Sequence, residues 1–426
     1  MVNSPFGTAY TWKNPQAAAW HPVKGPPPGA AAGGVLVKSP YLVYVFSMIL
    51  YDPSFTLRLI DYGIMIPVSP SRPDRIIEFL NSGITAGTRG ATLPYPGPVF
   101  DFTAARLRLG AAGPLINRDD LERVHSKAFT ASLYDGSSLA EALLETYELM
   151  DDQGRPRRYE PEKAVKPLID LFNTILAHVE GTYLACRLAL LEGPGFCYYL
   201  EGGTHHARYD RGSGFCLLND VASAAVKVLG ETPHPAPSGR EKPVRLIWVV
   251  DLDAHKGDGT AELVRFARER GELAGPGGAE SAGAGCILTL SIHMAKGWPL
   301  DGESLAAARP GRAPLVPSDI DIGIDSGEEA EYLPRLEEGI GRLEGLSAEY
   351  GGRPDLILVV DGSDPYEYDG LASSAPLKLT LDQCVRRDMF VYRYAAERGI
   401  PSAWVLAGGY GERAWEPPAH FLKGIR

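Results

Sequence analysis

Cysteine is scarce in this chain and shows no metal-binding or disulfide spacing. The 426 residues include five cysteines, an odd number, and no C-x-x-C pair occurs among them. This argues against both a disulfide framework and a thiolate zinc site. Long apolar runs are also lacking, because the longest, residues 41–50, is far shorter than the roughly 20 residues that span a bilayer. With no signal peptide visible, we expect a cytoplasmic protein with no membrane partner.

The chain contains fewer basic than acidic residues. The chain has 42 Lys and Arg against 53 Asp and Glu, a formal net charge of −11. This balance argues against a nucleic-acid partner, because the phosphate backbone requires a basic surface. An acidic surface is compatible with a cationic substrate, although solubility alone also accounts for it. Hydrophobic residues make up 45% of the chain, which predicts a globular core, and a homo-oligomer is compatible with this composition.

Short apolar runs alternate with helical patterns over most of the chain. The runs cover residues 42–50, 246–250, 286–291, 356–360 and 403–407. The helical patterns cover residues 164–191, 222–229, 261–270, 328–344 and 381–398. Buried strands between two layers of helices give such a pattern, so we predict an α/β fold of three layers with a central, mostly parallel sheet. Residues 1–40 are expected to be an irregular segment, and residues 41–426 a single domain.

Polar residues follow four of the predicted strands. They are Asp251 and Asp253, His293, Asp361 and Asp364, and the turn Gly408-Gly409-Tyr410. Ligands of parallel sheets bind at the carboxyl ends of the strands, so these side chains are expected to converge. Asp253 and His255 share one face of an extended segment, and Asp364 completes a set of two carboxylates and one imidazole. This set predicts a catalytic Zn²⁺ site with an open position, with Fe(II) or Co(II) as the alternative metals.

Two adjacent histidines, His205 and His206, predict proton transfer beside this metal. Asp251 and Asp258 are expected to orient the two imidazoles, although Asp258 also fits the cap of a helix. Tyr410 is expected to donate its hydroxyl to an oxyanion. Together these residues indicate a hydrolase assisted by a metal ion.

The motifs resemble those of the histone deacetylase superfamily and occur in the family order. The matching segments are residues 71–75, 121–126, 202–220, 251–259, 291–293, 362–364 and 408–410. The resemblance implies the arginase–deacetylase fold and a zinc-dependent hydrolase of an acylated amine, either acetyl-lysine or a small compound such as an acetylpolyamine. It implies that Asp253, His255 and Asp364 bind zinc, that His205 and His206 transfer protons, and that Tyr410 polarises the substrate carbonyl.

The resemblance also assigns residues around the reaction centre. It implies an acyl tunnel lined by Gly214, Phe215 and Trp298, and it places Arg75 near an inner product channel. A structural K⁺ would take oxygens from Asp251, Asp253, His255, Ser291 and Ile292.

The chain departs from the family pattern at three positions. Lys256 replaces a second histidine of the metal motif, Ser69 stands where histidine is frequent, and Trp298 replaces a smaller phenylalanine. The carboxylate that holds the substrate at the tunnel rim is left open among Asp151, Asp152 and Glu160.

Two other functions compete with the deacetylase. A ureohydrolase of the same fold with two manganese ions shares the triplet Asp253-Ala254-His255, but its next ligand falls on Gly257, which offers no side-chain donor. A catalytically idle binding protein is expected to have lost a ligand, a paired histidine or the tyrosine, and all are present in this chain.

Overall fold

The computed structural model describes residues 46–82, 99–191, 195–229, 231, 243–276, 284–300 and 315–425. These residues belong to one compact unit, residues 43–426. The predicted irregular segment, residues 1–40, lies outside the described residues.

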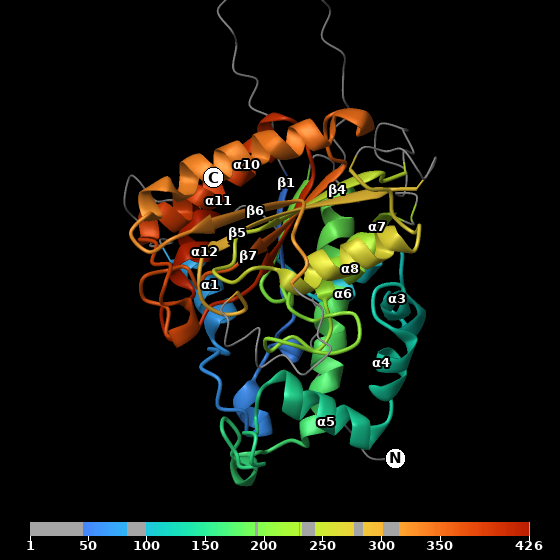
Figure 1. The fold of residues 1–426 in the computed structure, drawn as a ribbon, viewed down its shortest axis with the longest axis vertical. Helices are drawn as coiled ribbons and strands as arrows, with labels where there is room; N and C mark the ends of the chain where they lie inside the picture. Colours follow the sequence, from blue (N-terminus) through green and yellow to red (C-terminus); the bar gives the residue numbers. More distant parts are fainter. Residues whose placement is uncertain are drawn as a thin grey trace, which may run out of the picture. The chain divides into compact units, whose positions relative to one another are not determined.

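An eight-stranded sheet forms the centre of this unit (Figure 1). Its strands are β1 (Phe46–Leu50), β2 (Val99–Phe100), β3 (Gly195–Tyr199), β4 (Leu246–Asp251), β5 (Cys286–Met294), β6 (Ile320–Ile324), β7 (Leu356–Asp361) and β8 (Ser402–Leu406). Their order is β2-β1-β3-β8-β7-β4-β5-β6, and every neighbouring pair is parallel. The predicted parallel sheet is confirmed, and all its carboxyl ends face the same edge.

Helices cover both faces of the sheet. They are α1 (Arg72–Asn81), α2 (Phe102–Arg108), α3 (Arg118–Glu122), α4 (Lys127–Ser132), α5 (Gly136–Thr146), α6 (Leu171–Leu191), α7 (Asp220–Leu229), α8 (Asp258–Glu269), α10 (Tyr332–Leu346), α11 (Leu381–Glu397) and α12 (Glu416–Gly424). Short 3₁₀ turns are η1 (Pro53–Phe55), η2 (Leu59–Tyr62), η3 (Pro161–Lys163), η4 (Leu168–Asp170), η5 (Glu329–Glu331), η6 (Ala348–Tyr350) and η7 (Ala372–Ser374). None of the described helices is long and apolar enough to traverse a bilayer.

Alternate side chains of the strands enter two separate cores. Tyr198, Trp248 and Trp404 pack with α1, α10, α11 and α12 on one face. Tyr199 and Val249 pack with α2, α6, α7 and α8 on the other face. Because both faces are buried, the central strands consist of continuous apolar residues, and the result is the predicted three layers.

Two predicted helices begin later than expected. The pattern over residues 164–191 becomes η4 and then α6 from Leu171, because Pro167 cannot lie inside a helix and disfavours helical geometry in the residue before it. The pattern over residues 328–344 starts with η5, and α10 begins at Tyr332.

Candidate active site

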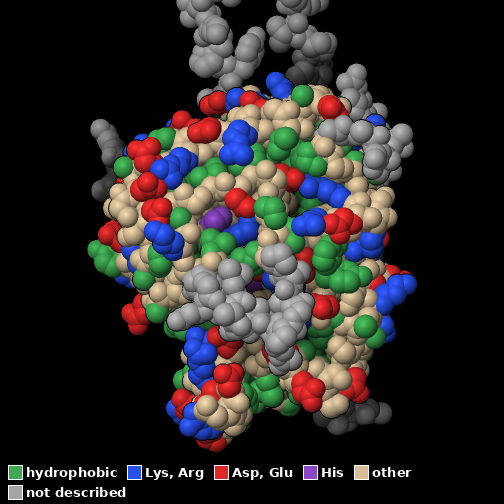
Figure 2. Space-filling view, in the orientation of Figure 1, with side chains coloured by type: hydrophobic (Ala, Val, Ile, Leu, Met, Phe, Trp, Pro, Cys, Tyr) green, Lys and Arg blue, Asp and Glu red, His purple; other side chains and the backbone are tan. Residues whose placement is uncertain are grey.

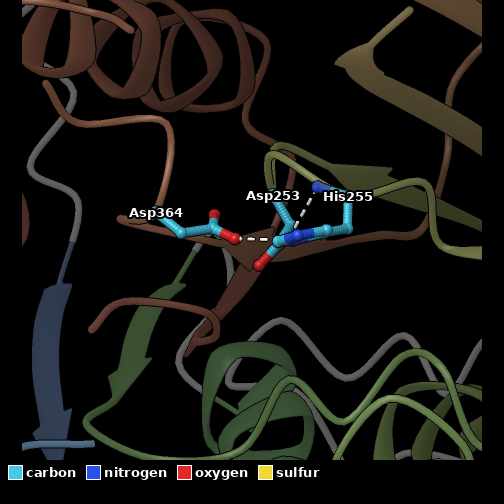
Figure 3. Close-up of side chains that lie close together, drawn as sticks. All are labelled: Asp253, His255 and Asp364. Carbon is cyan, nitrogen blue, oxygen red and sulfur yellow. Dashed lines mark hydrogen bonds and ion pairs between the residues drawn. The ribbon is translucent and has the colours of Figure 1, made fainter. Parts of the chain in front are cut away.

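Asp253, His255 and Asp364 meet beyond the carboxyl ends of β4 and β7. One potential ligand atom from each residue lies within 4.8 Å of the others, and all three residues are buried. His255 Nδ1 lies 3.2 Å from Asp253 Oδ1 and 2.8 Å from Asp364 Oδ2. Figure 3 shows the three side chains directed toward one another. The structure therefore brings the three predicted metal ligands together.

The charges of this group fit a bound cation. Burial and the neighbouring Asp253 raise the pKa of Asp364, because two carboxylates share a site from which water is excluded. Burial alone also raises the pKa of Asp253, but the nearby His205 and His255 outweigh burial and lower it. Two oxygen donors and one nitrogen donor form a set that Zn²⁺ accepts in catalytic sites. The residues present thus fit the predicted metal.

Close backbone approach fixes the two carboxylates. Gly408 N donates to Asp253 Oδ2 (3.0 Å), and Ala254 N donates to Asp364 Oδ1 (2.9 Å). A Cβ at Gly408 would lie 2.3 Å from Asp253 Oδ2, and a Cβ at Gly362 would lie 2.5 Å from the same atom. Any side chain at these two glycines would displace the ligand Asp253, which explains the glycine in each strand-end motif.

His255 is held from its far side. Its Nε2 lies 3.0 Å from Ser373 Oγ in η7, so a hydrogen bond there leaves Nδ1 facing the two carboxylates. A hydrogen bond to the second ring nitrogen is the usual way to orient an imidazole that binds a metal. Nothing in the sequence singles out Ser373 for this role.

His205 and His206 each have a buried carboxylate partner. His205 Nδ1 donates to Asp251 Oδ2 (2.6 Å), and His206 Nδ1 donates to Asp258 Oδ1 (2.8 Å). The ring centroids of the two histidines are 3.9 Å apart. The structure therefore pairs the residues as the sequence predicts.

The two histidines differ in their affinity for protons. Burial lowers the pKa of His205, but Asp251 and Asp253 outweigh burial and raise it to about 9. Burial and the charge of His205 hold the pKa of His206 well below its usual range. The carboxylate beside His206 does not compensate fully, because Asp258 also lies 3.5 Å from the guanidinium of Arg208. His205 is thus the more basic imidazole of the pair.

The start of α8 sets the backbone of the histidine pair. Thr260 N donates to His205 O (3.0 Å), and a Cβ at Gly259 would lie 2.4 Å from Ala207 O. The cap residue of α8 is Gly257, whereas Asp258 is the first residue of the helix and its carboxylate bonds His206. The alternative interpretation of Asp258 as a helix cap is therefore wrong.

Tyr410 is partly buried and lines the same cavity as His206 and His255. Its backbone nitrogen donates to Asp369 Oδ2 (2.7 Å), and Asp369 Oδ1 accepts from Leu371 N and Ser374 Oγ. Burial and the nearby Asp364 raise the pKa of Tyr410 well above its usual value, so its hydroxyl stays protonated. Asp369, which the sequence did not reveal as important, links Tyr410 to the turn that carries Ser373.

A cavity of about 240 Å³ leads to these residues. It is lined by His206, His255 and Tyr410 at its inner end and by Gly214, Phe215 and Trp298 along its walls. The Trp298 ring lies 4.5 Å from that of His206 and 5.7 Å from that of His255, centroid to centroid. Gly214 has a φ of +54°, and a Cβ there would lie 2.3 Å from Trp298 Cη2. The three residues predicted for the tunnel thus line one cavity.

The rim of this cavity differs from the prediction. Its charged residues are Glu148, Arg157 and Arg158. None of the predicted candidates, Asp151, Asp152 and Glu160, lines it: Asp151 pairs with Arg155 (2.8 Å) and Glu160 with Lys163. Glu148 was missed because the hairpin of residues 148–158 folds back on itself, which no local pattern indicates.

The predicted place of Arg75 near an inner product channel also differs from the structure. A second cavity of about 90 Å³ includes Asp253 and His255 of the metal group and extends to Arg72, Glu201 and His178. Arg72 is buried, and its Nη1 donates to Ala407 O (2.9 Å). Arg75 is exposed and donates to Glu412 O (2.6 Å), so the prediction for Arg75 is wrong and Arg72 occupies that position.

Other predicted residues lie close by but outside the metal group. Asp251 and Ser291 are directly opposite each other on β4 and β5, with Ile292 next in the strand, and a K⁺ there stays a prediction. Lys256 bonds Asp321 and Ser318, away from the ligands.

Two further strand-end residues also lie outside the metal group. Asp361 accepts from Tyr198 (2.6 Å) and Arg387 (2.7 Å) in the core, and His293 Nδ1 donates to Met294 O (2.8 Å). Neither residue therefore joins the three metal ligands.

The family assignment follows from comparison with known proteins. Residues 67–420 match the family model for the histone deacetylase domain. This match covers most of the chain, which therefore belongs to the histone deacetylase family, as its motifs predict. The solved acetylpolyamine aminohydrolase from Burkholderia pseudomallei aligns over 89% of this chain and 98% of its own, with a TM-score of 0.55 and 16% identity. That likeness confirms the arginase–deacetylase fold.

Curated relatives are more similar in sequence but align over a shorter length. An uncharacterized protein of Picosynechococcus is 29% identical over 56% of this chain and 63% of its own. Histone deacetylase 2 of Arabidopsis thaliana is 27% identical over 54% of this chain and 48% of its own. The acetoin utilization protein AcuC of Staphylococcus aureus is 26% identical over 51% of this chain and 46% of its own. The alignments thus span about half of the length of these relatives. The names of the three relatives differ from one another.

Proposed function

We propose that this protein is a zinc-dependent deacetylase that hydrolyses the amide bond of an N-acyl amine. The observation that carries the proposal is that the metal-ligand group, the two histidine–aspartate pairs and Tyr410 meet around one cavity, which is lined by His205, His206, Asp253, His255 and Tyr410. The metal ligands are Asp253, His255 and Asp364. When bound, Zn²⁺ would polarise the substrate carbonyl and lower the pKa of water to about 7.

The two histidines have separate roles in this proposal. His206 is neutral, and its Nδ1 is occupied by Asp258, so its Nε2 accepts a proton from the attacking water and later gives it to the leaving amine. His205 keeps its proton because Asp251 holds it, and its positive charge favours the negative charge that develops on the substrate.

Tyr410 and the tunnel residues complete the site. The protonated hydroxyl of Tyr410 donates to the oxyanion that forms on the carbonyl oxygen. Gly214, Phe215 and Trp298 enclose the carbon chain that joins the amide to the rest of the substrate. We assign the structural K⁺ to Asp251, Asp253, His255, Ser291 and Ile292.

The ureohydrolase alternative has less support. Among the described residues, one group of three side chains could hold a metal ion, whereas a di-manganese site requires additional carboxylates. Asp251, the last residue of β4, is bonded to His205.

The proposal is tested by metal-dependent turnover on a panel of acyl-lysine compounds and acetylpolyamines. We expect turnover that a chelator abolishes and that added Zn²⁺ restores, and arginine and other guanidino compounds should not be hydrolysed. Absence of turnover on all acyl-amines, in protein shown by metal analysis to hold one zinc, would contradict the proposal.

A further inference from the structure

The outer end of the active-site cavity carries a charged group that the proposed chemistry does not use. We call Glu148, Arg157 and Arg158 the rim cluster; it contains two guanidinium groups and one carboxylate. The chain as a whole has a net charge of −11, and the face in Figure 2 shows acidic and basic side chains interspersed. The rim cluster therefore has a net positive charge, opposite in sign to the net charge of the whole protein.

The fold fixes the rim cluster beside the tunnel wall. Glu148 follows α5 with a φ of +50°, and Arg157 N donates back to Leu149 O (2.9 Å), which closes the hairpin. Phe215 N donates to Thr146 O (3.1 Å), so the tunnel wall is bonded to the base of the same hairpin. The guanidinium groups are thus attached to the wall and not to an independent loop.

The two arginines differ in how closely they pair with Glu148. Arg158 pairs with Glu148 at hydrogen-bonding distance, and its guanidinium lies over the Phe215 ring, 5.4 Å from the centroid. Arg157 Nη1 lies 3.9 Å from Glu148 Oε2, beyond hydrogen-bonding distance, and its side chain is 58% exposed. Since Glu148 is largely neutralised by Arg158, the charge of Arg157 stays available to a ligand.

We propose that the rim cluster selects acylated amines that carry a carboxylate outside the tunnel and discriminates against acylated polyamines. This inference rests on the proposed function and adds the charge of the substrate to it. A guanidinium binds a carboxylate through two parallel hydrogen bonds, which Arg157 can offer. The ammonium groups of a polyamine would instead meet two like charges at the rim.

The first experiment compares three substrates on the zinc-loaded full chain. They are Nα-blocked Nε-acetyl-lysine with a free α-carboxylate, its uncharged carboxamide, and N-acetylspermidine. We expect kcat/KM to be about 10-fold higher for the carboxylate than for the carboxamide at low salt, and lowest for acetylspermidine. The advantage of the carboxylate should shrink at roughly 0.5 M NaCl because salt screens exposed charges. Acetyl-lysine peptides with and without a neighbouring Asp distinguish a peptide carboxylate from that of a free amino acid.

Variants assign the effect to Arg157. Arg157→Gln should remove the advantage of the carboxylate and leave kcat/KM for the carboxamide unchanged, and Arg157→Glu should reverse the preference. Arg155→Gln is the matched control, since Arg155 lies in the same hairpin but pairs with Asp151 and does not line the cavity. A higher kcat/KM for acetylspermidine than for the carboxylate, or equal effects of Arg157→Gln on both lysine substrates, would overturn the inference.

Binding to the metal-free protein separates this inference from the proposed function. Calorimetric titration with the carboxylate and the carboxamide should show tighter binding of the carboxylate, and Arg157→Glu should abolish the difference. If this difference is found but no substrate is hydrolysed, the proposed function fails and the charge selection stands. If hydrolysis occurs without any discrimination by charge, the inference fails and the deacetylase stands.

Discussion

At the scale of single residues, the partners of His205 and His206 decide how the two rings behave. The centroids of the two rings are 3.9 Å apart, yet the pKa of His205 is raised and that of His206 is lowered. The difference arises because Asp251 and Asp253 outweigh burial at His205, whereas burial and the charges of His205 and His255 lower the pKa of His206. Identical side chains can therefore perform different tasks in one site.

We predict that Tyr410→Phe lowers kcat by about 10²–10³-fold, because it removes one donor to the oxyanion. Its zinc content should equal that of the wild type, since Tyr410 is not among the three ligands. Steady-state kinetics and metal analysis check both points. Tyr368→Phe, which alters an exposed tyrosine near the same turn, is the control, and a kcat for Tyr410→Phe like that of the control would refute the assignment.

His125 provides a prediction for stability as a function of pH. It is buried, its Nδ1 donates to Arg208 O (2.8 Å), and its Nε2 accepts from Asn219 N (3.1 Å). Burial lowers the pKa of His125 from 6.5 to about 4. Below pH 6.5 this histidine is therefore protonated in the unfolded chain but stays neutral in the folded protein until the pH reaches about 4. The folded state thus loses stability as the pH falls.

The size of the effect of His125 follows from this pKa. At about 1.4 kcal/mol for each pH unit, His125 should cost the wild type roughly 2–3 kcal/mol between pH 7 and pH 4.5. In His125→Gln this loss should be absent, so the difference between the two unfolding free energies should change by that amount. Urea unfolding of both proteins with chelator present measures it, and a constant difference across this range would exclude the proposed cause.

The motifs predicted the metal group, the histidine pair and the tunnel walls, but not the rim cluster or the place of Arg72. Asp253, His255 and Asp364 could be found because ligand spacing and strand ends leave a local trace. Arg72 and Arg75 are three residues apart in one motif, and only the buried face of α1, which includes Arg72 and Ile76, distinguishes them. No local sequence pattern indicates the rim cluster, because its residues come together only when the hairpin of residues 148–158 folds back on itself.

At the scale of elements, the first turn of α8 acts as a template for the histidine pair. We predict that Gly259→Ala destabilises the protein by about 1–3 kcal/mol, because its Cβ would overlap with backbone atoms of residues 205–207 that cannot rotate away. Turnover should fall as well, since His206 moves with this backbone.

Gly341→Ala is the matched control for this substitution. Gly341 lies on the exposed face of α10, and a Cβ there meets nothing within 4 Å. Alanine favours the helix, so we expect a gain of about 0.5–1 kcal/mol and unchanged turnover. Urea unfolding and activity of both variants provide the comparison, and a neutral Gly259→Ala would contradict the template role.

The elements that were predicted from sequence are those with the simplest environments. Strands β4, β5, β7 and β8 lie inside the sheet, so their continuous apolar runs reveal them. Strand β6 lies at the edge and alternates between buried and exposed residues, and β3 contains Gly, Cys and Tyr in a run of only five residues. Their assignment as strands depends on neighbours that are distant in sequence, which local patterns do not report.

At the scale of the whole molecule, the metal group couples ligand binding to global stability. We predict that zinc raises the midpoint of thermal unfolding, because it binds the assembled ligands of β4 and β7 and stabilises the folded state by about 4 kcal/mol at 1,000 times the Kd. Calorimetry with and without chelator checks this.

Asp364→Ala provides a sharper version of the same test. Its unfolding midpoint should not respond to zinc, because one of the three ligands is missing. A midpoint that rises with zinc as much as that of the wild type would show that this aspartate does not bind the cation.

The position of β8 has a consequence for the order in which the protein forms. This strand, the last of those described, is inserted between β3 and β7, so the two halves of the sheet touch only after residues 402–406 have been synthesised. Until then, the segments with the histidine pair and the metal ligands belong to separate, unsatisfied sheet edges on a nascent chain. The metal ligands all follow β4 and β7, which pair with each other, whereas the histidine pair follows β3 on the far side of β8. Insertion of β8 thus brings the histidine pair to the metal ligands, and a chain cut short before β8 would hold the two groups on separate pieces of sheet.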